Sequence, residues 1–157
     1  MNSTNFLFAS LDRERIQVQS EVSSSKRLLQ AMSHLLMTGL DEEAKEKDVY
    51  HLLLEREKIG NTGVGNGVAI PHSRCDFTDE AVVAIMTMEN AVDYDSLDKQ
   101  PVDIAFGLLV PTEATQNHLN LLADIAKLMS NDSHKKTLAS AKTSDEVLNL
   151  INHWTTT

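Results

Sequence analysis

Three apolar runs, rich in β-branched residues, separate the helical parts of this chain and constrain its fold more than any other feature. They are VAI (68–70), AVVAIMTM (81–88) and DIAFGLLV (103–110). The second and third runs are continuous rather than alternating, which is typical of strands covered on both faces. Because helical segments precede and follow them, we predict an α+β fold. It would be a single three-layer α/β/α domain with a central mixed β-sheet.

The flanking segments carry the signals of one further strand and several amphipathic helices. The strand is expected at 15–19, and the helices are expected at 23–40, 48–58, 115–130 and 143–154. Serines precede the first helix, Asp48 is the expected N-cap of the second helix, and Gly60 follows its end. The last helix has Thr143 or Ser144 as its cap, with Glu146 placed for a capping box.

The helix at 115–130 is expected to bury one apolar stripe. The residues of that stripe are Leu119, Leu122, Ile125, Ala126 and Met129.

Length and composition predict one intracellular domain. The chain has 157 residues, so we expect a single domain over 1–157 with a compact part at about 12–153. Its one cysteine excludes an intrachain disulfide, and neither a secretory signal nor an apolar run of membrane-spanning length is present. We therefore expect a cytoplasmic protein that does not insert into a membrane.

The charge balance narrows the classes of partner. Fourteen basic and twenty-three acidic residues give a net charge of −9. Nucleic-acid binding requires a basic stripe, so it is not expected here. A basic patch on a partner protein is compatible with this charge.

The segment NTGVGNGVAIPHSRC (61–75) concentrates glycines before a histidine. Its glycines match no nucleotide loop, since no Gly-Lys-Ser/Thr ends it and a helix precedes it where a strand is required. Two interpretations stay open: a tight connection that needs positive φ, or a loop that serves a site. No acidic residue occurs from Lys58 to Cys75, and with Arg56 and Arg74 this stretch predicts a local basic pocket suited to an anion.

His72 is the strongest candidate for chemistry. Pro71 restricts the backbone directly before it, so the ring is presented from a rigid strand end. A neutral imidazole is nucleophilic, and its ordinary pKa of about 6.5 leaves it mostly neutral in a cell. Phosphoryl transfer to such a nitrogen needs positioning and charge compensation, and the planar guanidinium of Arg56 supplies the charge.

His118 is the second candidate, because free N–H groups at the head of the expected third helix favour an anion. The alternative, an ordinary surface or core histidine, stays open for it. We expect the remaining histidines to be structural: His34, His51, His134 and His153. No zinc-type spacing is present, so we expect no metal and no cofactor.

Two long stretches resemble a known family. LLLEREKIGNTGVGNGVAIPHSR and QPVDIAFGLLVPTEATQNHLNLLADIAKLM are similar to the fructose/mannitol-type IIA domain of the bacterial phosphotransferase system. IGNTGVGNGVAIPH most resembles its nitrogen-regulatory branch. With SSSKRLLQAMSHLL and SDEVLNLI, the resemblance covers nearly the whole chain.

The resemblance implies a phosphoryl-carrier protein with a regulatory role. His72 would be phosphorylated by HPr or its nitrogen-branch paralogue, and Arg56 and His118 would match the family's other site residues. Regulated partners such as transporters or sensor kinases are implied. The alternatives are a stand-alone IIA subunit that passes phosphate to a IIB domain for uptake of a sugar, and a domain that binds an anion without turnover.

Overall fold

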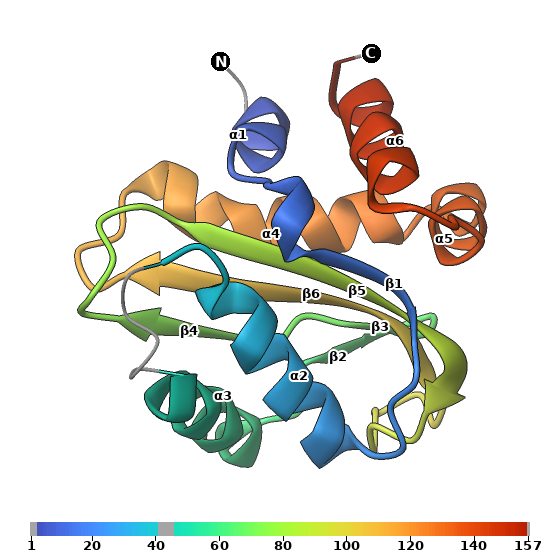
Figure 1. Cartoon of the computed structure of the whole chain (residues 1–157), viewed down its shortest axis with the longest axis horizontal. Coiled ribbons are helices and arrows are strands. Elements are labelled where there is room, and N and C mark those ends of the chain that lie inside the picture. The colour runs from blue at the N-terminus through green and yellow to red at the C-terminus, as the bar shows by residue number, and fades with distance from the viewer. Residues whose placement is uncertain (1–2, 41–45, 157) are drawn as a thin grey trace.

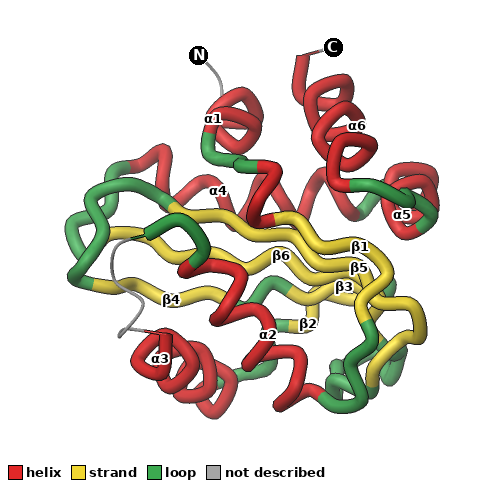
Figure 2. Tube along the Cα trace, viewed as in Figure 1, coloured by secondary structure: helices red, strands yellow, loops and turns green. Residues whose placement is uncertain are grey.

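The computed structural model describes residues 3–40 and 46–156 as a six-stranded sheet between two layers of helices (Figure 1; Figure 2). The strands are β1 (Ile16–Ser20), β2 (Gly63–Gly65), β3 (Val68–Ala69), β4 (His72–Cys75), β5 (Val82–Val92) and β6 (Val102–Pro111). The α-helices are α1 (Ser3–Ala9), α2 (Ser25–Met37), α3 (Glu46–Ile59), α4 (Gln116–Met129), α5 (Asp132–Ala139) and α6 (Ser144–Thr156), and a 3₁₀ turn, η1, spans Arg13–Arg15.

The sheet is mixed, as predicted. Its strand order is β1-β5-β6-β3-β2, and β4 also pairs with β6. β5 and β6 are antiparallel, whereas β1 is parallel to β5 and both β3 and β4 are parallel to β6. Helices cover both faces of the two long central strands, β5 and β6, which explains their continuous apolar sequences.

Each face of the sheet has its own apolar core. Figure 1 shows α2 and α3 on one side and α1, α4, α5 and α6 on the other. Side chains along β5 alternate between the cores: Val82 and Ala84 face α2 and α3, while Val83 and Ile85 face the other layer. Leu7 of α1 is fully buried in that second core, so the packed part of the chain extends upstream of residue 12.

The helix boundaries bear out most of the capping signals. Ser24 caps α2 by accepting the Arg27 N–H at 3.2 Å. Thr143 caps α6 by accepting the Glu146 N–H at 3.1 Å. The Glu146 carboxylate accepts from Lys142 rather than from the cap residue, so the capping box closes one residue earlier than expected.

Two details of the predicted helices are wrong. α3 begins at Glu46, so Asp48 lies in its first turn, where a carboxylate still favours the helix dipole, and does not cap it. α4 buries a stripe displaced from the expected one: Leu119 is 45% exposed, whereas Leu121 is fully buried. Leu122 and Ala126 pack at the side of the core, and the stripe now includes His118.

Candidate functional site

His72 is the first residue of β4, at the point where Pro71 interrupts pairing along β6. β3 pairs with β6 up to Ala69, and β4 resumes the pairing with His72 opposite Leu108. The Leu108 N–H donates to the Pro71 carbonyl at 3.0 Å across this gap. His72 is therefore held from both sides by main-chain bonds to one long central strand.

The ring of His72 is half-buried, and one of its nitrogens is already bonded. Its Nδ1 lies 2.6 Å from the Ile70 carbonyl oxygen. A carbonyl can only accept, so Nδ1 must carry the proton and donate it. In the neutral ring the lone pair therefore sits on Nε2, which is the available nucleophilic atom.

The surroundings of His72 favour its neutral form. Burial lowers the pKa of the imidazole below its ordinary value, and the charge of Arg56 lowers it further. The hydrogen bond to Ile70 and the charge of Glu57 raise this pKa, but they do not reverse the shift. His72 is consequently unprotonated and nucleophilic at neutral pH.

Arg56, the predicted charge-stabilising residue, lies in the last turn of α3. Its charge acts on His72, and its Nη1 donates to the Gly60 carbonyl at 2.7 Å, which keeps the guanidinium at the end of its own helix. A guanidinium has five N–H donors, so this bond leaves others for an anion.

The predicted basic pocket contains fewer basic side chains than the sequence indicated. Lys58 pairs with Glu55 at 2.9 Å on the exposed surface of α3. Arg74 is exposed and donates to the Thr112 carbonyl at 3.0 Å. Of these three basic residues, Arg56 is the one whose charge acts on His72.

An acidic residue that the sequence did not single out lies beside the site. Glu57 accepts the Thr62 N–H at 3.1 Å and also accepts from the Thr62 hydroxyl. The Thr62 hydroxyl lies 3.0 Å from the Tyr94 hydroxyl. Glu57 and Thr62 are close in sequence, but Tyr94 is 32 residues further on, so no spacing pattern could have found this cluster.

His118 is buried at the head of α4, with 7% of its surface exposed. Its Nδ1 accepts the Thr115 N–H at 3.0 Å, and Thr115 in turn caps the helix. The Phe6 ring of α1 lies 5.5 Å from it, centroid to centroid. Because Nδ1 is an acceptor, the neutral ring carries its proton on Nε2.

The two histidines lie on different elements, β4 and α4, which both contact β6. Within residues 3–40 and 46–156, no hydrogen bond joins His72 to His118. His72 is paired with Leu108, which belongs to the core beneath α4. β4 ends where the Thr112 N–H donates to the Cys75 carbonyl, shortly before α4 begins. The fold thus places His118 on the helix layer over that core.

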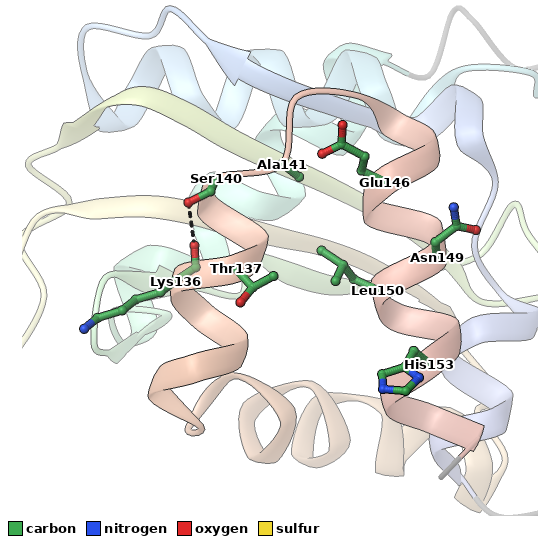
Figure 3. A pocket seen from close by; sticks show the side chains of 8 residues that line it. All are labelled: Lys136, Thr137, Ser140, Ala141, Glu146, Asn149, Leu150 and His153. Carbon is green, nitrogen blue, oxygen red and sulfur yellow. Dashed lines mark hydrogen bonds between the residues drawn. The ribbon is translucent and has the colours of Figure 1, made fainter.

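A separate pocket of about 660 Å³ lies between α5 and α6 (Figure 3). Leu150 points into it, and the Ser140 hydroxyl donates a hydrogen bond to the Lys136 carbonyl at 2.9 Å. None of His72, Arg56 and His118 lines it.

In the described part of the chain, no group of three or more histidine, cysteine or acidic residues could hold a metal ion. No described helix has the length and apolar character needed to cross a membrane.

This arrangement, a neutral histidine on a mixed sheet beside an arginine, coincides with a match to a known family. The model of the phosphoenolpyruvate-dependent sugar phosphotransferase system family EIIA 2 matches residues 9–154. The chain therefore belongs to the fructose/mannitol-type EIIA family of this system, as the sequence resemblance implied.

Several of the similar proteins are nitrogen regulatory proteins. A nitrogen regulatory protein homolog from Haemophilus influenzae is 35% identical over 139 residues, covering 87% of this chain and 85% of the relative. A nitrogen regulatory protein from Pseudomonas aeruginosa is 38% identical over 128 residues, covering 82% of each. The crystal structure of nitrogen regulatory protein IIA-Ntr from Neisseria meningitidis superposes with a TM-score of 0.84 at 34% identity, covering 93% of this chain and 99% of that one.

Proposed function

We propose that this protein is a regulatory phosphoryl carrier that accepts a phosphoryl group on Nε2 of His72 from a phosphohistidine of an HPr-type carrier. The observation that carries the proposal is the bond between His72 Nδ1 and the Ile70 carbonyl. It leaves the nucleophilic lone pair on the other nitrogen of a neutral, half-buried ring. Membership of the EIIA family supports phosphoryl transfer as the chemistry.

The transfer is a single in-line displacement. The Nε2 lone pair of His72 forms the new N–P bond while the donor's N–P bond breaks, and that electron pair returns to the donor imidazole. The proton of His72 stays on Nδ1, and the Ile70 carbonyl stabilises the positive charge that develops on the ring. Little covalent assistance is needed, so positioning and charge stabilisation account for the rate.

Arg56 and His118 have distinct roles in this proposal. Arg56 would neutralise the phosphoryl oxygens with the guanidinium donors that Gly60 does not occupy. His118 would orient the group through its Nε2–H, since its Nδ1 is already an acceptor for Thr115. One ring thus acts as nucleophile and the other as hydrogen-bond donor.

The carrier function is tested by incubating the protein with phosphoenolpyruvate, enzyme I and either HPr or its nitrogen-branch paralogue. We expect one alkali-stable, acid-labile phosphoryl group on His72, and none on His72→Ala. Comparing the two carriers identifies the donor. Label on His72→Ala at the wild-type level would refute the assignment.

The regulatory function depends on how phosphorylation changes the surface. A phosphoryl group adds roughly −1.5 to −2 charges, by analogy with hydroxyl phosphates, to a protein whose net charge is already −9. Docking to partners such as transporters or sensor kinases should therefore differ between the two forms. Pull-downs with phosphorylated and unphosphorylated protein test this. Identical sets of partners for the two forms would contradict a regulatory function. Efficient phosphoryl transfer to a sugar-specific IIB domain would instead favour a role as a sugar-transport subunit.

A further inference from the structure

We propose that Glu57 is a positioning residue for His72 and that it acts through Thr62 and Ile70, although it does not touch the nucleophilic ring. This inference deepens the proposed function and rests on it. It assigns a role to Glu57, which was not among the predicted site residues.

The first link ties the end of α3 to the loop that follows it. Glu57 accepts two hydrogen bonds from Thr62, one from the main-chain N–H at 3.1 Å and one from the hydroxyl. Thr62 is 4% exposed, so both donors are removed from water. A buried donor without a partner costs about 1–3 kcal/mol, and Glu57 therefore fixes the position of this residue.

The second link passes from Thr62 to the histidine. The Thr62 carbonyl accepts the Ile70 N–H at 2.9 Å, and the Ile70 carbonyl accepts from His72 Nδ1 at 2.6 Å. Ile70 is fully buried and precedes Pro71, which restricts its backbone to extended conformations. The hydrogen bond from the Ile70 N–H to Thr62 therefore sets the direction in which the Ile70 carbonyl points.

Tyr94 fixes the direction of the hydroxyl bonds. The Thr62 hydroxyl donates to Glu57, so it must accept from the Tyr94 hydroxyl 3.0 Å away. Burial raises the pKa of Tyr94 above its ordinary value, and the charge of Glu57 raises it further, so this phenol remains a donor. The Asn61 side chain also donates to the Tyr94 carbonyl at 2.8 Å, which secures the same loop.

The consequence is a continuous series of hydrogen bonds from Tyr94 and Glu57 to the ring of His72. Its last bond sets which ring nitrogen carries the proton, and hence which nitrogen attacks. Arg56 precedes Glu57 in the same helical turn, so that turn supplies both the charge for the phosphoryl group and the anchor for the loop. A shift of this loop would disturb the tautomer of His72 as well as its position.

The test compares Glu57→Ala with Glu57→Gln, and uses Glu55→Gln as the matched control. Gln can still accept the Thr62 N–H, whereas Ala cannot. Glu55 is an exposed residue of the same helix whose partner is Lys58. Nitrogen-15 NMR of the unphosphorylated protein reads the His72 tautomer, and labelling by the phosphorylated carrier reads the rate.

For Glu57→Ala we expect a mixture of His72 tautomers and a labelling rate lower by about tenfold, as a misplaced reacting group produces. Glu57→Gln should keep the proton on Nδ1 and recover most of the rate, and Glu55→Gln should match the wild type. If Glu57→Ala does not fold, Thr62→Val and Thr62→Ser replace it. Val should then disturb the tautomer, whereas Ser should preserve it.

An unchanged tautomer and rate in Glu57→Ala, or in Thr62→Val where that pair is used, would overturn the proposal. The tautomer is measured without any phosphoryl donor, so its outcome is independent of the carrier function. Failure of the wild-type protein to be labelled would refute the proposed function and would leave the NMR result to decide the positioning role.

Discussion

The two candidate histidines, at the start of β4 and at the head of α4, are the same residue type in opposite settings. His72 is half-buried and donates from Nδ1 to a main-chain carbonyl. His118 is buried and accepts at Nδ1 from a main-chain N–H. The backbone thus selects opposite tautomers. His72 is left with a lone pair on Nε2, and His118 is left with a proton there.

This difference shows that the nearest backbone group selects the tautomer of each histidine. A strand end before a proline offers a carbonyl, while a helix N-terminus offers N–H groups. The first setting leaves the lone pair that the proposed nucleophile requires, and the second leaves an N–H that can donate. The predictions below test the division of roles, beginning with the largest effect after loss of His72 itself.

Removing the guanidinium of Arg56 should lower phosphoryl transfer to His72 more than the other changes described below. We expect Arg56→Gln to lower the labelling rate by about 10²–10³, the usual loss when a charge-stabilising donor is removed. Quantitative labelling over time measures it. Lys58→Gln is the control, because Lys58 pairs with exposed Glu55, and its rate should equal that of the wild type. Equal losses in both variants would mean that general surface charge, not Arg56, matters.

Replacing His118 should separate its helix cap from its chemistry. Gln at this position can still accept the Thr115 N–H, as capping-box residues do, but it lacks the imidazole. We expect His118→Gln to lower labelling by about tenfold, which corresponds to the loss of one hydrogen bond to a charged group. Its free energy of unfolding should stay near the wild-type value, whereas His118→Ala should lose about 1 kcal/mol or more with the cap bond. A labelling rate in His118→Gln equal to that of the wild type would show that His118 has only a structural role.

The smallest effect concerns pH. The pKa of His72 is lower in the folded than in the unfolded protein, mainly through burial. The unfolded state therefore binds more protons below about pH 6.5. The stability contributed by neutral His72 is complete above that pH and declines as the pH falls towards the folded pKa. Urea unfolding at pH 7.5 and 5.5 should show a smaller acid loss for His72→Gln than for the wild type. A loss of equal size would contradict the shift.

The sequence predicted the main architecture because the long strands are continuous apolar runs and the long helices have strong periodicity. β5, β6, α2 and α4 were all expected within a few residues of their observed bounds. The short β4 was missed, since HSRC carries no alternation of its own and is a strand only through its pairing with β6. The buried face of α4 was misplaced because its leucines at 119, 121 and 122 fit two adjacent stripes, and only packing against the sheet and α1 decides between them.

The site was predicted unevenly for a similar reason. Pro71 and His72 are adjacent, so their joint effect can be read from the sequence. Glu57 could not be found that way, because its significance depends on Thr62 and on Tyr94, which only the folded sheet brings together. Lys58 was assigned to a basic pocket, but its side chain forms an ion pair with Glu55 on the exposed surface of α3.

The most direct test is to locate the phosphoryl group by nitrogen-15 and phosphorus-31 NMR on protein labelled through the carrier. The result expected here is a bond from phosphorus to Nε2 of His72, with a proton retained on Nδ1. Phosphorus on Nδ1 of His72, or on His118, would contradict the central claim that the Ile70 carbonyl selects the nucleophilic atom.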